Sequence, residues 1–152
     1  KTQKEKKLVA KAKLEIVSSG KVDLTKAVIS FRLENLKNAV YNFTLSNAKG
    51  ESVTFGINNS ESFLFLDRSK SGKIDFSEKF ASTVSKALLN KNQKTADLKI
   101  VLDKTSIEIF YNNGEKVMTE LFFPTQPFTS FSASSNEGIE INNLIINQLK
   151  TN

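Results

Sequence analysis

Few residues in this chain could support catalysis, and two glutamates stand out among them. Glu108 and Glu120 flank the turn sequence Asn112-Asn113-Gly114, in two segments where apolar and polar residues alternate. With a three-residue loop the two glutamates would face each other across a hairpin, with Cβ atoms about 5 Å apart. Carboxyl groups at about 5 Å are the nucleophile and the acid of retaining glycosidases.

A two-residue loop gives the same hairpin a different register. That register pairs Glu108 with Thr119, and the two carboxylates then separate. The glutamates would in this case belong to a charged strand face, neutralised by lysines of a neighbouring strand. We favour this structural interpretation and expect the chain to contain no catalytic residue.

The missing residue types exclude several other chemistries. The chain has no His and no Cys, so it lacks a Ser-His-Asp triad, a Cys-His pair and the usual zinc ligands. No Asp-x-Asp-x-Asp-Gly run is present, so we expect no metal site and no cofactor. Asp67, Arg68 and Asp103 could form a ligand site. However, a carboxylate beside an Arg at a strand end more often fixes a turn or caps the backbone.

Positive charge is concentrated at the start of the chain. Residues 1–13 contain six lysines and Glu5, a net charge of +5 out of +6 for all 152 residues. A nucleic-acid-binding protein would spread Lys and Arg over a broad surface. The remainder of this chain is nearly neutral, so we expect no nucleic-acid partner. No apolar run approaches the ~20 residues of a membrane helix.

Alternation with a period of two predicts about ten short strands and little helix. The clearest stretch is 97–124, a three-strand meander with an Asn-Gly turn that ends at Pro124. Residues 139–149 predict a closing strand with a bulge at Asn142-Asn143. Residues 78–93 are expected to be a helical or irregular insertion. The other strands are expected at 8–16, 28–33, 41–45, 53–57, 63–66 and 128–131.

This pattern is typical of an all-β sandwich or barrel. We divide the chain into a basic tether or first strand at 1–13 and a single β-sandwich domain at 14–152. Because the chain begins at Lys1 rather than at Met, we expect it to be part of a longer protein.

Three segments resemble the C-terminal β-sandwich module of glycoside hydrolase family 32, the invertases, levanases and inulinases. They are LDKTSIEIFYNNGEKVMTELFFP at 102–124, FLFLDRSKSG at 63–72 and GIEINNLIINQLK at 138–150. The first segment is the most specific of the three. The residues that carry the resemblance are Asp67, Arg68, Ser69, Asp103, Ser106, Glu108, Phe110, Asn113, Gly114 and Pro124.

The resemblance implies a two-sheet antiparallel sandwich of the lectin-like jelly-roll (concanavalin A-like) type. In that family the catalytic residues lie in an N-terminal five-bladed propeller, in Trp-Met-Asn-Asp-Pro-type, Arg-Asp-Pro and Glu-Cys motifs. This chain has no Trp, no Cys and no Arg-Asp-Pro. The resemblance therefore implies a non-catalytic accessory module of a fructan- or sucrose-hydrolysing enzyme, secreted or periplasmic in a bacterium.

Two roles remain open for such a module. By parity, Phe110 and Met118 should lie on the face opposite Ile109 and Tyr111, which would leave an apolar face to pack against the propeller. The alternative is a carbohydrate-binding, fructan-binding or adhesion module. Sugar platforms favour Trp and Tyr, whereas 12 of the 14 aromatic residues here are Phe, so most rings should lie in a core. The candidates for contact with a domain or a sugar are Tyr41, Phe110 and Tyr111.

Overall fold

The chain folds as two antiparallel sheets that face each other. The computed structural model describes residues 2–18, 21–72, 84–90 and 93–149. In spatial order, sheet A consists of β1 (Thr2–Ala10), β12 (Ile139–Gln148), β3 (Ala27–Leu33), β8 (Ala96–Leu102), β9 (Ser106–Tyr111) and β10 (Lys116–Leu121). Sheet B consists of β2 (Lys13–Val17), β11 (Ser130–Ser134), β4 (Val40–Ser46), β5 (Ser52–Asn58), β6 (Phe63–Asp67) and β7 (Ser85–Leu88).

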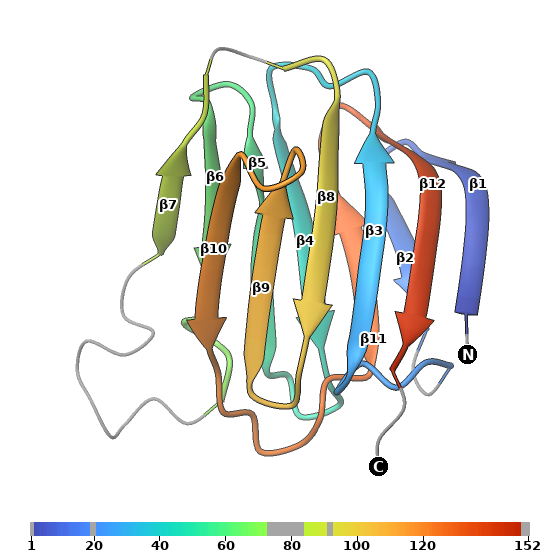
Figure 1. Cartoon of the computed structure of the whole chain (residues 1–152), viewed down its shortest axis with the longest axis vertical. Coiled ribbons are helices and arrows are strands. Elements are labelled where there is room, and N and C mark those ends of the chain that lie inside the picture. The colour runs from blue at the N-terminus through green and yellow to red at the C-terminus, as the bar shows by residue number, and fades with distance from the viewer. Residues whose placement is uncertain (1, 19–20, 73–83, 91–92, 150–152) are drawn as a thin grey trace.

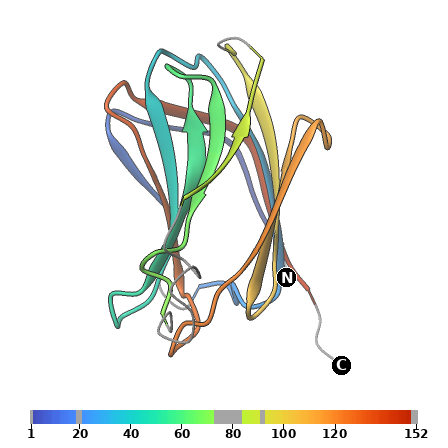
Figure 2. The ribbon, with the colours of Figure 1, turned by 90° about the vertical axis from the view of Figure 1, so that its left-hand side faces the viewer.

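This arrangement confirms the predicted β-sandwich (Figures 1 and 2). The described residues form twelve strands instead of about ten. They contain no helix that is long and apolar enough to cross a membrane. The predicted meander is present as β8, β9 and β10, and the closing strand β12 has a register shift between Asn142 and Ile145. Asn143 within this bulge has a φ of 55°.

The two additional strands come from two wrong predictions. The strand predicted at 8–16 is two strands, β1 and β2, which lie in different sheets. Alternation runs through both because a period of two does not encode the bend at Lys11-Ala12. The insertion predicted at 78–93 contains the strand β7, which pairs with the edge of β6. Residues 78–83 and 91–92 lie outside the described part of the chain.

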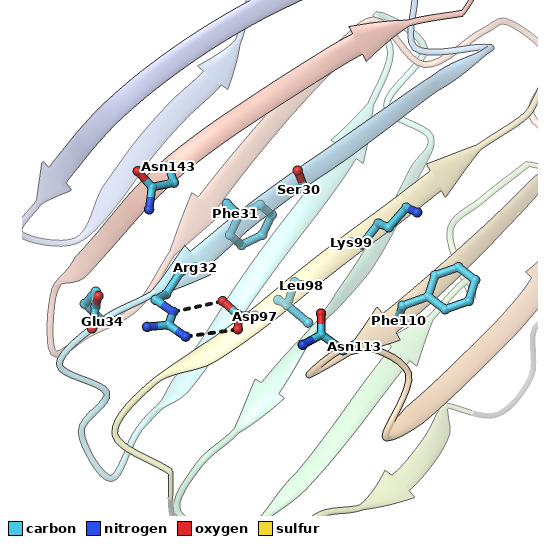
Figure 3. Close-up of a pocket in the computed structure, with 10 residues that line it drawn as sticks. All are labelled: Ser30, Phe31, Arg32, Glu34, Asp97, Leu98, Lys99, Phe110, Asn113 and Asn143. Atoms are coloured by element: carbon cyan, nitrogen blue, oxygen red, sulfur yellow. Dashed lines mark hydrogen bonds and ion pairs between the residues drawn. The ribbon is translucent and has the colours of Figure 1, made fainter.

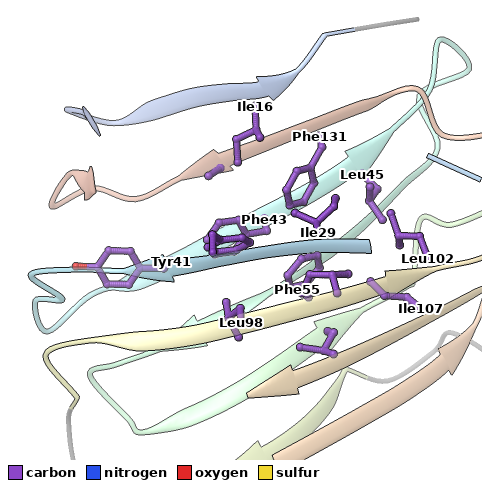
Figure 4. Packing of buried hydrophobic residues seen from close by; sticks show 14 of the residues in the cluster. Ile16, Ile29, Tyr41, Phe43, Leu45, Phe55, Leu98, Leu102, Ile107 and Phe131 are labelled. Carbon is purple, nitrogen blue, oxygen red and sulfur yellow. The ribbon is translucent and has the colours of Figure 1, made fainter. Parts of the chain in front are cut away.

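Phenylalanine rings fill the centre of the core between the two sheets (Figure 4). The Phe43 ring centroid lies 5.0 Å from that of Phe31, 5.5 Å from that of Phe55 and 6.1 Å from that of Phe131. Each of these four side chains is at most 4% exposed. Burying a side chain of this size contributes about 2–3 kcal/mol, so the stack joins β3 of sheet A to β4, β5 and β11 of sheet B.

A glycine is required in the middle of sheet B. Gly56 of β5 pairs with Asn42 of β4 and with Phe65 of β6. A Cβ atom placed on Gly56 would lie 1.8 Å from the Tyr41 backbone oxygen and 3.2 Å from the Phe65 ring. The first of these contacts is with backbone that cannot move without breaking the strand pairing.

We expect Gly56→Ala to destabilise the fold by at least about 3 kcal/mol, because overpacking against backbone is costly. Gly50→Ala is the control, since nothing lies within 4 Å of its added Cβ. Its φ of +82° predicts a smaller loss of about 1–2 kcal/mol. Urea unfolding measures both free energies, and equal losses would contradict the requirement at Gly56.

Candidate functional site

The two glutamates that resemble a catalytic pair point to opposite faces of sheet A. The register pairs Glu108 with Thr119 and Glu120 with Ile107. This is the register of the two-residue loop, so the facing pair drawn from a three-residue loop is wrong. Glu108 lies on the outer face beside Val101 of β8, whereas Glu120 shares the face of buried Met118. These two carboxylates cannot act on one glycosidic bond.

Glu120 belongs instead to a junction between the two sheets. The Arg68 guanidinium lies 3.2 Å from the Glu120 carboxylate and donates a hydrogen bond of 2.8 Å to the Leu121 carbonyl oxygen. The Ser85 hydroxyl of β7 donates to the other Glu120 oxygen at 2.7 Å. The Arg68 and Glu120 side chains are 18% and 21% exposed. The edge strands β7 and β10 are therefore linked by a largely buried polar network.

The residues around Arg68 hold this junction in place. The Asp67 carboxylate accepts hydrogen bonds from the Ser69 backbone N–H (2.9 Å) and hydroxyl (2.6 Å), which fixes the turn after β6. Gly72 packs so closely on the next segment that an added Cβ would lie 2.5 Å from the Pro124 Cα. Two of the three segments that carry the family resemblance thus meet in space and make structural contacts.

The remaining signature residues shape the two turns of the meander. The Asp103 carboxylate accepts a hydrogen bond from the Lys104 N–H, and the Asp103 N–H donates to the carbonyl oxygen of Ser106, which begins β9. Asn113 and Gly114 have φ values of 61° and 92°, as a tight hairpin requires. The described contacts of Asp103 lie within its own turn. They do not involve Asp67 or Arg68.

Two of the three aromatic contact candidates are buried. Tyr41 is 2% exposed and Tyr111 is 1% exposed, so neither ring can meet a sugar or a second domain at the surface. The Tyr41 hydroxyl accepts a 2.6 Å hydrogen bond from the Lys37 N–H, and burial raises the pKa of Tyr111. Met118 is 8% exposed and pairs with Ile109 on the inner face, so its predicted outward position is wrong. Of the three contact candidates, only Phe110 lies on the outer face of sheet A.

Phe110 forms one wall of a pocket on the outer face of sheet A (Figure 3). This pocket of about 650 Å³ crosses β12, β3, β8 and β9. Arg32 donates two hydrogen bonds to Asp97 across its floor, from Nε at 2.9 Å and from Nη2 at 3.1 Å. We call it the polar pocket, and its other polar side chains are Ser30, Glu34, Lys99, Asn113 and Asn143.

The two open sides of the sandwich differ in chemistry. Strand β1 presents exposed Lys4, Lys6 and Lys7 at one side, and β2 follows it there after a two-residue turn. Charged residues of this kind keep edge strands from pairing with other chains. The opposite side, where β7 meets β10, carries apolar side chains on both outer faces instead: Val84 and Leu88 lie with Phe63 and Phe65 on sheet B, and Val117 and Leu121 lie with Phe110 and Ser106 on sheet A. We call it the apolar edge, and its exposed members are Val84 (41%), Leu88 (76%), Val117 (49%) and Leu121 (50%).

A second hollow of about 580 Å³ adjoins the apolar edge on the outer face of sheet B. Phe63 and Phe65 line it together with Val40 and Val84. The Lys86 ammonium lies 4.7 Å from the Phe63 ring centroid. The sequence did not reveal these outward rings, because Phe and Leu alternate in FLFL and either set could face the core.

The junction predicts a loss of stability when Arg68 is replaced. We expect Arg68→Met to cost about 2–3 kcal/mol, somewhat less than breaking a fully buried pair, because Glu120 would be left without its cation. Arg32→Met, at an ion pair whose side chains are 45% and 39% exposed, is the control and should change stability little. Urea unfolding compares the variants, and a larger loss for Arg32→Met would contradict this assignment.

The Arg32–Asp97 pair predicts a pH dependence of stability. Hydrogen bonds from Arg32 lower the pKa of Asp97 in the folded chain. The pair therefore stabilises the fold above the ordinary aspartate pKa of about 4, and this contribution is lost as the pH falls through the folded pKa. We expect Asp97→Asn to lower the Tm slightly near neutral pH and not in acid. Thermal melts of both proteins across this range test it, and a constant difference would exclude a charge effect.

Similar proteins are enzymes much longer than this chain. The levanase of Bacillus subtilis is 32% identical over 88 residues, which cover 57% of this chain and 13% of the levanase. An extracellular exo-inulinase of Aspergillus niger is 37% identical over 62 residues, which cover 41% of this chain and 12% of that protein.

Solved structures show the same sandwich as one part of a larger chain. An exo-inulinase from Aspergillus awamori matches 99% of this chain with a TM-score of 0.77 and 21% identity, over 29% of its own length. A fructofuranosidase from Schwanniomyces occidentalis, solved with fructose, matches 99% with a TM-score of 0.71 and 21% identity, over 34% of its length. At 21% sequence identity, the similarity to these two structures establishes the fold of this chain and nothing further.

The family model described as "Glycosyl hydrolases family 32 C terminal" matches residues 1–150. This match covers nearly the whole chain. The chain therefore belongs to the C-terminal domain family of the family 32 glycosyl hydrolases.

Proposed function

We propose that this chain is the non-catalytic accessory domain of a fructan- or sucrose-hydrolysing enzyme and that it packs against the catalytic propeller of that enzyme. Relatives named levanase and exo-inulinase support the class of parent enzyme. The separation of Glu108 from Glu120 supports a domain without its own catalytic pair. The relative named extracellular exo-inulinase supports an extracellular location.

The observation that carries the proposal is the apolar edge. Leu88 on β7 and Leu121 on β10 are both half exposed or more, and the Arg68–Glu120–Ser85 network holds their two strands together. An uncovered edge of this kind invites pairing with other chains. A catalytic domain packed here would bury the apolar side chains and cover the free backbone groups of both edge strands.

Nearby residues extend the same surface. Phe63 and Phe65 line the hollow beside β7, so a partner that covers the apolar edge would also reach two aromatic rings. Large apolar and aromatic side chains at the centre of an interface supply most of its binding energy. The lysine-bearing side at β1 has the opposite character and suits solvent.

The proposal predicts different outcomes for the full-length enzyme and for this chain alone. We expect the double variant Leu88→Asp, Leu121→Asp to lower the Tm of the full-length enzyme by roughly 1–2 °C, as about 1–2 kcal/mol of interface energy is lost. The Tm of the isolated chain should hardly change, because both side chains are exposed there. Differential scanning calorimetry measures both.

Val9→Asp is the matched control, because Val9 is apolar and 63% exposed but lies on β1 at the other side. It should leave the full-length enzyme unchanged. If the double variant melts like the unmodified enzyme, or if Val9→Asp is equally harmful, packing at the apolar edge is excluded.

A further inference from the structure

We infer that the polar pocket on the outer face of sheet A binds a fructosyl unit of a fructan chain. The choice of sugar rests on the proposed function, whereas the site itself rests on the geometry of sheet A. Its volume of about 650 Å³ lies within the range of small-molecule sites, about 300–1,000 Å³.

The hollow exists because one short side chain lies among long ones. Ser30 of β3 pairs with Lys99 of β8 and with Ile145 of β12. Lys99 pairs in turn with Phe110 of β9. A serine in this row leaves a depression in the middle of the sheet, bounded by Lys99 and the Phe110 ring on one side.

The floor of the pocket is prepared to bind hydroxyl groups. Arg32 and Asp97 hold each other through two parallel hydrogen bonds, so both side chains are oriented before any ligand arrives. The guanidinium keeps N–H donors and the carboxylate keeps lone pairs beyond these two bonds. A sugar hydroxyl can therefore accept from Arg32 while a neighbouring hydroxyl donates to Asp97.

Two asparagines lie at the ends of the pocket. Asn113 projects from the hairpin turn and Asn143 from the bulge of β12, with φ values of 61° and 55°. Bulges re-aim side chains beside functional sites. Within the described residues, the Ser30, Lys99, Asn113 and Asn143 side chains make no hydrogen bond to one another or to other groups, so their donors and acceptors remain available.

The charge of the pocket selects a neutral ligand. Arg32 and Lys99 balance Asp97 and Glu34, so neither an anion nor a cation is favoured. The half-buried Phe110 ring supplies an apolar wall for the C–H groups of a sugar, and Lys99 Nζ lies 5.9 Å from its centroid. A neutral polyol with one apolar face fits this combination better than a charged ligand or a protein surface.

The test is binding of levan and inulin oligosaccharides to this chain, measured by calorimetry and by affinity electrophoresis, with a maltooligosaccharide for comparison. We expect saturable binding of at least one fructan and none of the glucan. Ser30→Leu fills the hollow and should weaken binding at least tenfold. Lys99→Ala and Asn143→Gly should each weaken it about threefold or more, and glycine suits the positive φ at position 143.

Ser132→Leu is the matched control, because Ser132 occupies the outer face of sheet B, and it should leave binding unchanged. Thermal melts confirm that each variant is folded. No saturable fructan binding, equal binding of the glucan, or full binding by Ser30→Leu would overturn the inference. Leu88→Asp, Leu121→Asp leaves the pocket intact, so an unchanged Tm of the full-length double variant together with retained sugar binding would count against the proposed function alone.

Discussion

The face-to-face packing of two sheets around Phe43 constrains the rest of the molecule. The Phe43 ring contacts rings from both sheets, and every inward position on the central strands is occupied by a residue of this core. Because successive side chains alternate between faces, half of each central strand is committed to stability. Variation that carries function is therefore restricted to the two outer faces, the turns and the open edges.

The open edges are the weak points of this architecture, since a sandwich does not close on itself as a barrel does. At one side the lysines of β1 protect the edge by charge. At the other side Arg68 joins β6 and β7 to β10 through Glu120 and the Leu121 carbonyl oxygen. Arg68, one of the residues that carry the resemblance, therefore maintains the geometry of an edge.

Much of the fold followed from alternation and turn residues, and the failures have physical causes. The meander and the bulge at Asn143 could be predicted because each depends on a local pattern. The break between β1 and β2 could not, because alternation continues across a bend. The pairing partner of Glu108 could not be predicted because it depends on the length of the hairpin loop. Met118 was placed on the wrong face because its odd or even position was compared with that of Ile109 without knowing how the two strands pair. Tyr41 and Tyr111 show that an amphipathic ring is no guide to exposure when a core needs its volume.

The apolar edge lies along β7 and β10, whereas the polar pocket crosses β12, β3, β8 and β9 and meets that edge only where Val117 pairs with Phe110. This arrangement has a consequence for affinity. A domain that packs along β7 and β10 leaves β12, β3 and β8 open to solvent. A sugar site there would be tethered to the catalytic domain, so a polymer chain held by one domain is presented to the other at an effective concentration in the millimolar range. Weak binding is then sufficient, which agrees with an open pocket that has a single aromatic wall and a neutral set of polar groups.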